Sequence, residues 1–369
     1  MKVAVDAHMI GERETGNESY TLNLLRGLAA LPDDDTQYRV LTPRSHALQG
    51  LVAFPPRFEV VRVWPAASSL RIPLGIPLAV RAARCDLLHV TYIAPPRPGC
   101  RTVVTIHDLS FLAHPEWLSR RVRFTLNRLV PRSVRAAARV IAISDFTKQD
   151  LVQRYGLPPE KIVVVPLAAD ASFTLLPDPA AGPLPDRVRE PFILAVGNLE
   201  PRKNLVTLIN AFAELVRQHA FAGPLVIAGK AKYRGDEAAG VVARLGLEAR
   251  VVFTGFVEDA TLRLLYSRAK LFAYPSLYEG FGLPLLEAMA CGCPVVASNA
   301  TAIPQTVGGA AILVDPASVA ALATAMGRVL NDPDLARRLS VEGRAQAGRF
   351  SWTRTADLTR RVYQDAVRA

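Results

Sequence analysis

Short apolar runs alternate with helical patterns along almost the whole chain. The first run, at 2–6, is followed by Leu22, Leu25, Leu28 and Leu31, whose spacing places them on one face of a helix. Apolar runs of this kind, bounded by turn residues, are typical of strands that are buried on both faces of a parallel sheet. The pattern therefore predicts an α/β protein built from repeated strand–helix units.

The alternation falls into two series separated by a polar stretch. A segment rich in Pro, Gly, Asp and Ala spans 171–190 and is typical of a linker. The length of 369 residues also suits two domains better than one. We therefore expect a first domain at 1–170, a linker at 171–190 and a second domain at 191–351. The expected strands are 2–6, 38–42, 58–63, 86–91, 102–107, 140–143 and 161–166, then 192–196, 224–229, 250–254, 271–274, 293–297 and 311–314.

The stretch 271–299 has the most distinctive pattern, because a strand, a glycine-containing loop, a helix and a second strand follow one another. Glu279 lies in the loop, and Glu287 lies in the first turns of the helix. Glycines let the main chain approach a ligand, and amides at a helix start favour an anion. The residues therefore fit a nucleotide-sugar site. They also fit a tight turn followed by a Glu that favours the helix N-terminus electrostatically.

Arg202 and Lys203 form a second cluster, between the strand 192–196 and a helix expected at 205–216. Arginine donates a planar fork of hydrogen bonds and lysine supplies a compact charge, so two such cations beside free helix amides suit a diphosphate. A charged surface loop is the alternative explanation for either residue alone.

The segment from Glu279 to Glu287, within the string 275–298, resembles the E-x7-E signature of the retaining glycosyltransferases of family 4, which have the GT-B fold. The resemblance implies two Rossmann-like domains that face each other across a donor cleft, with the terminal helix, 352–369, crossing back to the first domain. It also implies that Glu279 contacts the donor sugar and that Glu287 binds the ribose. The loop residues implied to contact sugar and phosphate are Gly280, Phe281, Gly282 and Leu283.

Other positions of the second domain match the same family. Its members use an Arg and a Lys for the donor diphosphate, and Lys203 aligns with that Lys. This chain has Asn198 where many members have the Arg, and Arg202 is the substitute. Gly255 and Phe256 resemble the strand end that contacts the nucleobase. In catalysis, Arg202 and Lys203 would stabilise the leaving diphosphate, an electrostatic role.

In the first domain the resemblance points to two loops at strand ends. The loop 8–17 contains Gly16, which can bring the main chain to a phosphate. His107 ends the strand 102–107, where family members place a His near the reacting carbon of the donor sugar. Asp108 and Ser144 are expected on the acceptor side. A histidine satisfied by local backbone bonds is the ordinary alternative for His107.

The resemblance implies a retaining transfer of a hexose from a nucleoside diphosphate sugar to a hydroxyl acceptor, in which the departing phosphate takes the acceptor proton. The segments 107–109 and 200–204 are most similar to bacterial mannosyltransferases of polysaccharide assembly, so GDP-mannose is the expected donor and a glycan or lipid-linked sugar the acceptor. No metal and no other cofactor is expected, and we interpret the acidic run 33–35 as a solvated turn. A nucleotide-sugar 2-epimerase and a non-catalytic nucleotide-sugar-binding partner remain as alternatives.

The net charge of +11 favours anionic partners. Nucleic acid is not expected, because no reader module is recognisable. The basic amphipathic segment 120–139 fits either a solvated helix face or peripheral contact with an anionic membrane. A cytoplasmic protein is expected, since the N-terminal residues form a strand pattern instead of a signal peptide. The four cysteines show no metal-binding spacing.

Overall fold

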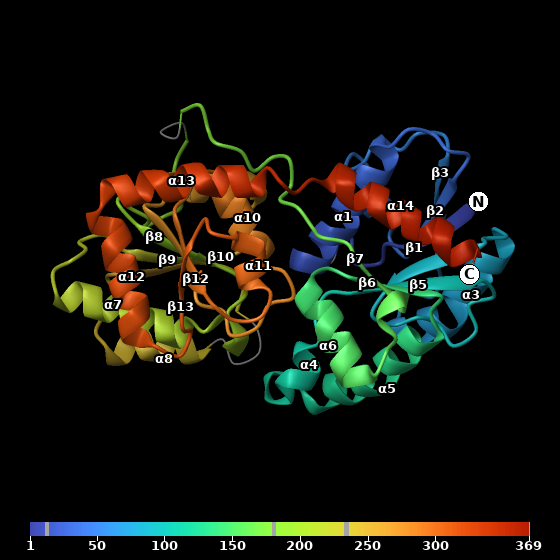
Figure 1. Ribbon diagram of the computed structural model, residues 1–369, viewed down its shortest axis with the longest axis horizontal. Helices are drawn as coiled ribbons and strands as arrows, with labels where there is room; N and C mark the ends of the chain where they lie inside the picture. The colour runs from blue at the N-terminus through green and yellow to red at the C-terminus, as the bar shows by residue number, and fades with distance from the viewer. Residues whose placement is uncertain (12–14, 179–181, 232–235, 369) are drawn as a thin grey trace. The chain divides into compact units, whose positions relative to one another are not determined.

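The computed structural model describes residues 1–11, 15–178, 182–231 and 236–368 (Figure 1). The chain divides into two compact units. Unit 1 comprises residues 1–167 together with 351–369, and unit 2 comprises residues 168–350. The chain therefore leaves unit 1 once and returns to it through its terminal helix.

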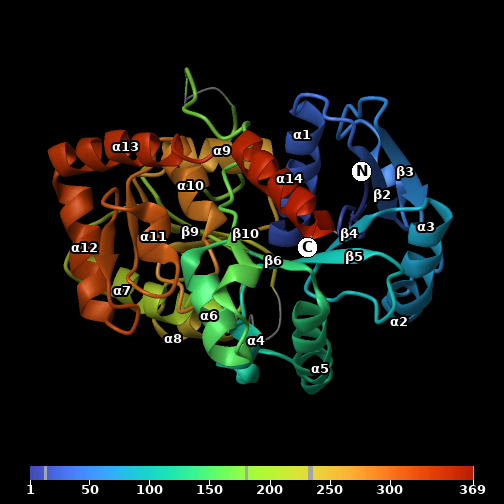
Figure 2. The ribbon, with the colours of Figure 1, turned by 45° about the vertical axis from the view of Figure 1, so that its right-hand side comes forward.

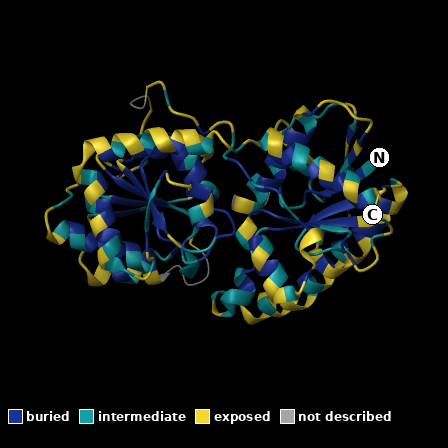
Figure 3. Cartoon of the chain, in the orientation of Figure 1, coloured by how far each residue is buried: buried dark blue, intermediate teal, exposed yellow. Residues whose placement is uncertain are grey.

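Unit 1 contains a seven-stranded parallel sheet with the strand order β3-β2-β1-β4-β5-β6-β7. Its central strands are buried along almost their whole length, as the short apolar runs predict, whereas the two edge strands are only partly buried (Figure 3). The strands are β1 (Lys2–Asp6), β2 (Gln37–Thr42), β3 (Phe58–Arg62), β4 (Leu87–Thr91), β5 (Arg101–Ile106), β6 (Arg139–Ala142) and β7 (Ile162–Val164).

Helices cover both faces of this sheet. On one face, α1 (Thr15–Ala30) lies along the terminal helix α14 (Trp352–Arg368), as Figures 1 and 2 both show. On the other face, α3 and α5 share one apolar cluster with the sheet, through Ile76, Val80, Val130 and Val134. The remaining segments are α2 (Ser68–Leu70), a π-helical turn (Arg71–Gly75), α3 (Ile76–Ala82), α4 (Ser110–Ala113), α5 (Arg120–Ala136) and α6 (Asp145–Tyr155).

Unit 2 contains a six-stranded parallel sheet with the order β10-β9-β8-β11-β12-β13. Helices α7, α8 and α12 pack on one face of it, around Phe212, Leu208 and Met326. The strands are β8 (Ile193–Val196), β9 (Leu225–Ala228), β10 (Val251–Gly255), β11 (Leu271–Tyr274), β12 (Val295–Ser298) and β13 (Ile312–Val314). The helices are α7 (Leu205–Arg217), α8 (Asp236–Arg244), α9 (Asp259–Arg268), α10 (Leu283–Ala290), α11 (Ile303–Val307), α12 (Val319–Asn331) and α13 (Pro333–Ala347).

Each sheet has a point where the strand order reverses. In unit 1 this point lies between β1 and β4, and in unit 2 it lies between β8 and β11. Ligands of open parallel sheets bind outside the carboxyl ends of the strands at such a point. The topology thus directs attention to the loops that follow these strands.

One local prediction is wrong, and one helix is continuous in spite of an internal proline. Gly16 lies in the first turn of α1 instead of in a loop, because the helix begins at Thr15. Pro131 does not interrupt its helix: α5 continues from Arg120 to Ala136. Proline removes one main-chain hydrogen bond, but Val130 and Val134 on either side of it are fully buried against the sheet and hold the helix in place.

Candidate active site

The two segments singled out from the sequence meet in unit 2. Arg202 and Lys203 end a short 3-10 turn (Pro201–Lys203) between β8 and α7, and Glu279 lies between β11 and α10. The strands β8 and β11 are neighbours at the reversal of strand order. A main-chain bond, from the Leu277 amide to the Arg202 carbonyl at 2.8 Å, ties the two loops together. Parallel-sheet topology therefore accounts for their proximity.

Glu279 is the centre of a buried ionic cluster. One of its carboxylate oxygens, Oε1, accepts a hydrogen bond from Lys203 Nζ at 2.6 Å, and the other, Oε2, accepts one from Arg202 Nη1 at 2.7 Å. Arg202 Nε also donates to Glu200 Oε1 at 2.5 Å. Two cations and two carboxylates thus share one loop pair, which leaves the cluster without net charge.

The surroundings fix the charge state of this cluster. Burial alone would raise the pKa of Glu279, but the charges of Arg202 and Lys203 outweigh burial and lower that pKa to about 2. Burial and the neighbouring Arg202 charge lower the pKa of Lys203, and Glu279 opposes this effect. Because Lys203 donates to a carboxylate, we treat the pair as ionised.

Tyr274 and Thr301 complete the cluster, and the sequence analysis missed both. The Tyr274 hydroxyl accepts from Lys203 Nζ at 2.7 Å and donates to Glu279 Oε1 at 2.8 Å. Thr301 Oγ1 accepts from the Glu279 amide at 3.0 Å. Tyr274 is the last residue of β11, and this position at a strand's carboxyl end is a signal that could have identified it.

A glycine makes room for the lysine. A Cβ at Gly197 would lie 2.7 Å from Lys203 Cε, and Gly197 has φ of +143°, a conformation that favours glycine. Asn204 has a left-handed conformation, and its Nδ2 donates to the Pro275 and Pro316 carbonyls at 3.1 and 2.7 Å. Through these bonds to main-chain carbonyls, Asn204 holds the loop that contains Arg202 and Lys203 against the loop that contains Glu279.

Helix α10 begins with Leu283, and Pro284 lies in its first turn. Gly282 precedes it with φ of +95°, a conformation that favours glycine. The side chain of Phe281 is buried edge-on to Phe350, with ring centres 5.7 Å apart. Phe281 would therefore contact a donor through its main chain. Its neighbour Gly280 has no side chain and can contact a donor only through its main chain.

Glu287, the second Glu of the signature, is in a different environment from Glu279. Tyr266 donates a hydrogen bond to its Oε2 at 3.1 Å. Burial, reinforced by repulsion from Asp259 and Asp170, raises the pKa of Glu287 to about 7 although the Tyr266 hydrogen bond opposes the shift. Two carboxyls eight residues apart thus have pKa values on opposite sides of the usual range, which is typical of functional sites.

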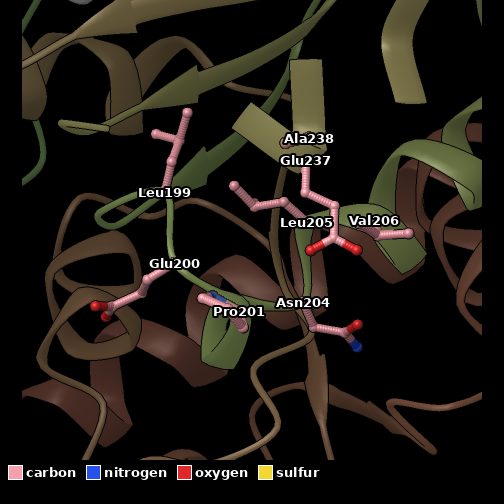
Figure 4. A pocket seen from close by; sticks show the side chains of 8 residues that line it. All are labelled: Leu199, Glu200, Pro201, Asn204, Leu205, Val206, Glu237 and Ala238. Atoms are coloured by element: carbon pink, nitrogen blue, oxygen red, sulfur yellow. The ribbon is translucent and has the colours of Figure 1, made fainter. Parts of the chain in front are cut away.

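The carboxyl ends of β8 and β10 contribute the remaining predicted residues of unit 2. Gly255 ends β10, and the ring of Phe256 is 38% exposed with Lys230 Nζ at 4.7 Å from its centre. Asn198 follows the end of β8. A pocket of about 170 Å³ lies beside this region (Figure 4). It is lined by Leu199, Glu200, Pro201, Asn204, Leu205, Val206, Glu237 and Ala238.

In unit 1, His107 directly follows β5. The ring of Tyr20 meets it edge-on, with centres 4.6 Å apart. Burial lowers the pKa of His107 to about 4, so its imidazole is neutral at pH 7. Its Nε2 is buried and has no hydrogen-bond partner among the described residues. His107 therefore offers one uncommitted polar atom at the carboxyl end of a strand.

The two residues predicted on the acceptor side make local bonds. Asp108 Oδ1 accepts from the amide and the hydroxyl of Ser110, at 2.9 and 2.7 Å. Ser144 is buried, and its hydroxyl accepts from the Thr147 amide as the cap of α6. This hydrogen bond satisfies one of the free amides in the first turn of α6. An acceptor-side role for either residue stays a prediction.

Comparison with known proteins identifies the family of this chain. Residues 182–346 match the family model described as glycosyl transferases group 1, and residues 15–173 match the one described as glycosyltransferase family 4. The chain is 34% identical over 270 residues to an O-antigen chain mannosyltransferase B of Escherichia coli, covering 72% of this chain and 70% of that protein. It is 35% identical over 332 residues to an MMP alpha-(1->4)-mannosyltransferase of Mycolicibacterium hassiacum, covering 84% and 78% of the two chains.

The fold has close counterparts among solved structures. A sucrose-phosphate synthase from Thermosynechococcus elongatus superposes with a TM-score of 0.78 over 99% of this chain and 98% of its own, at 24% identity. The fold and both family matches lead to the same assignment. The fold consists of two parallel α/β sheets and a terminal helix that returns to the first unit. The chain belongs to the GT-B glycosyltransferases and is a glycosyltransferase.

Proposed function

We propose that this protein transfers mannose from GDP-mannose to a hydroxyl group of a glycan or lipid-linked acceptor, with retention of the anomeric configuration. The cluster of Glu279 with Lys203 and Arg202 at the strand reversal of unit 2 is the observation that carries the proposal. The relatives named above support the choice of mannose, because both are described as mannosyltransferases.

The cluster is suited to a charge that grows during the reaction. When the glycosidic bond breaks, the leaving diphosphate gains negative charge, and cations held in place beforehand stabilise it without reorganisation. Lys203 and Arg202 would bind the diphosphate together with the first amides of α10, where the helix dipole favours an anion. Glu279 would then accept hydrogen bonds from sugar hydroxyls.

The other predicted residues have compatible roles. Glu287 has a pKa near 7, so it can accept from or donate to the ribose hydroxyls. The exposed ring of Phe256 and the end of β10 would contact the base. His107, neutral and with Nε2 unpaired among the described residues, would contact the donor sugar. The departing phosphate itself would take the proton of the acceptor.

A thermal-shift titration with GDP, UDP and ADP tests the donor site. A nucleotide at about 100 times its dissociation constant adds roughly 2.7 kcal/mol to stability. We expect GDP to stabilise the wild type most and Lys203→Ala to lose this gain. Lys148→Ala, which removes a bond from Nζ to the Ile162 carbonyl in unit 1, should keep it. Equal loss in both variants, or no stabilisation by any nucleotide, would refute the diphosphate clamp.

Product analysis tests the reaction itself. With GDP-mannose and a mannosyl acceptor, we expect GDP release that depends on the acceptor and an α-linked product by NMR. Conversion of the nucleotide sugar without any acceptor would indicate an epimerase instead. Binding without turnover, over a range of acceptors, would indicate a non-catalytic protein.

A further inference from the structure

The net positive charge of the chain is concentrated in one part of unit 1. Residues 60–144 contain thirteen arginines, no lysine and three acidic residues, which gives a net charge of +10 for this stretch. The whole chain has a net charge of +11, so the charges elsewhere nearly cancel. Such an uneven distribution favours an anionic partner at the surface that these residues form.

The same stretch exposes large apolar side chains. Trp64, Leu70, Leu74 and Leu78, which we call the apolar stripe, are 77%, 49%, 55% and 63% exposed. The three leucines recur every fourth residue along the helical segment formed by α2, the π-helical turn and α3. Residues with this spacing lie on one side of a helix. Ile76 and Val80 of the same segment are buried against the sheet, so the stripe faces away from it.

The stripe has an uncharged centre and a basic rim. Between Trp64 and Val80 the one charged residue is Arg71, which is buried and donates to the Ala66 carbonyl at 3.0 Å. Arg62, Arg81 and Arg84 lie at the two ends of the segment and are exposed. No acidic residue occurs from 60 to 85. Apolar side chains and cations are therefore arranged without any competing negative charge.

Helix α5 adds a second basic surface on the same face of the sheet. Its Val130 and Val134 share one core cluster with Ile76 and Val80 of α3. Its outer side exposes Val122 and Phe124, at 44% and 67%, together with several arginines. The exposed arginines of α5 are Arg120, Arg121, Arg128, Arg132 and Arg135.

The charges and apolar side chains of this face indicate which kind of partner it binds. A second copy of the chain would bring two surfaces of the same strong charge together, which is unfavourable. A nucleic acid would satisfy the arginines but would leave four large apolar side chains in water. Anionic lipid satisfies both, because acyl chains accept the apolar side and headgroups accept the cations. Trp64 suits the boundary between the two layers.

We infer that this face of unit 1 docks on an anionic lipid surface, with the apolar stripe among the acyl chains and the rim arginines and those of α5 among the headgroups. The inference places the anchor at 64–78, whereas the sequence analysis considered only 120–139. It is independent of the donor proposed above. Among the described residues no helix is both long and apolar enough to cross a bilayer, and docking of this kind needs none.

Vesicle flotation is the direct test. We expect the protein to float with vesicles that contain about 30% phosphatidylglycerol in phosphatidylcholine, and not with phosphatidylcholine alone, at about 0.1 M salt. The fluorescence of Trp64, one of three tryptophans, should shift to the blue on binding. Trp64→Phe should remove that shift.

Two sets of variants separate the contributions of the leucines and of the arginines to vesicle binding. Each of Leu74→Ser and Leu78→Ser should weaken partitioning about tenfold, since each removes one leucine from lipid. Val341→Ser, at a 52% exposed position of α13 in unit 2, is the matched control and should have no effect. Arg121→Glu combined with Arg128→Glu should reduce binding most strongly at low salt. All five positions are exposed, so the variants should fold.

Three results would overturn the inference. The first is failure to bind anionic vesicles. The second is binding that the leucine variants leave unchanged, because charge alone would then explain it. The third is a dimer in solution that Leu74→Ser dissociates, because a second copy would then cover the stripe.

Discussion

Each unit contains a polar network, which consists of neutral groups in unit 1 and of oppositely charged groups in unit 2. In unit 1, His89 lies 2.6 Å from the Tyr363 hydroxyl and 2.7 Å from Thr105 Oγ1, which in turn lies 3.0 Å from the Tyr20 hydroxyl. Burial lowers the pKa of His89 to about 3, so all members are neutral at pH 7. In unit 2, the corresponding groups are the fully ionised Lys203, Arg202 and Glu279.

The difference indicates different tasks. The neutral network joins β4 and β5 to helices α1 and α14, so it holds the helices on the sheet. Buried ion pairs add little net stability, because desolvation offsets their attraction. A cluster of ions is therefore better explained by binding than by folding. Three variants test this contrast, in order of decreasing effect.

Glu279→Gln should have the largest effect. The substitution removes the negative charge that neutralises Lys203 and Arg202, so both cations become more available to a diphosphate. We expect catalytic turnover to fall by about 100-fold or more, while binding of the nucleoside diphosphate stays equal or becomes tighter. Calorimetric titration and initial rates measure the two quantities.

Glu200→Gln is the matched control for Glu279→Gln. Glu200 also pairs with Arg202, but Lys203 donates its hydrogen bond to Glu279 and not to Glu200, and we expect less than a tenfold loss of turnover. A parallel loss of nucleotide binding and turnover in Glu279→Gln would mean that this carboxylate holds the loops together rather than contacting the sugar.

Tyr363→Phe tests the neutral network. It leaves Nδ1 of His89 without its partner in a buried site, which should lower the free energy of unfolding by about 1–3 kcal/mol. Urea denaturation measures this loss. Tyr155→Phe is the control, because the Tyr155 hydroxyl is buried and has no partner within the described ranges. Unchanged stability in Tyr363→Phe would show that the network does not hold α14.

Glu287→Gln should change the pH dependence of stability. The pKa of Glu287 is about 7 in the folded protein and about 4.5 when unfolded. At pH values between these two, the folded state therefore keeps a proton on Glu287 that the unfolded state has lost. The free energy of unfolding contributed by this group therefore falls as pH rises from about 4.5 to 7. The side chain is partly exposed, so we expect a change of about 1–2 kcal/mol.

The comparison of wild type with Glu287→Gln isolates this contribution. Glu279, with its pKa lowered to about 2, contributes stability that is constant above about pH 5 and is lost only as pH falls toward 2. The variant should therefore gain stability relative to wild type as pH rises from 5 to 8. Parallel melting curves across this range would contradict the raised pKa.

Local patterns were sufficient for much of the fold. The expected strands occur within a few residues of their predicted positions, because buried strands of parallel sheets read as short apolar runs. Parallel topology then brought the loops at Lys203 and Glu279 together, although the roles of these residues came from a family resemblance. Neither periodicity nor resemblance revealed Tyr274, which acts through contacts to residues distant along the chain.

Other features depend on tertiary contacts that no local pattern encodes. The link from His89 to Tyr363 joins residues 274 positions apart. The segment 64–84 is apolar on several sides, so its pattern could not separate the buried Ile76 from the exposed Leu74 and Leu78. For Gly16, the helix start at Thr15 could not be recognised from the polar residues around it.

The return of the chain to unit 1 has a consequence for synthesis. The helix α14 covers α1 and supplies the buried residues Ala356, Val362 and Tyr363, yet it is made only after the whole of unit 2. At ribosomal rates, residues 168–350 take roughly 10–40 s to produce. During that interval the face of α1 that α14 later covers lacks this partner helix, and apolar surface that is exposed in this way favours aggregation of the nascent chain.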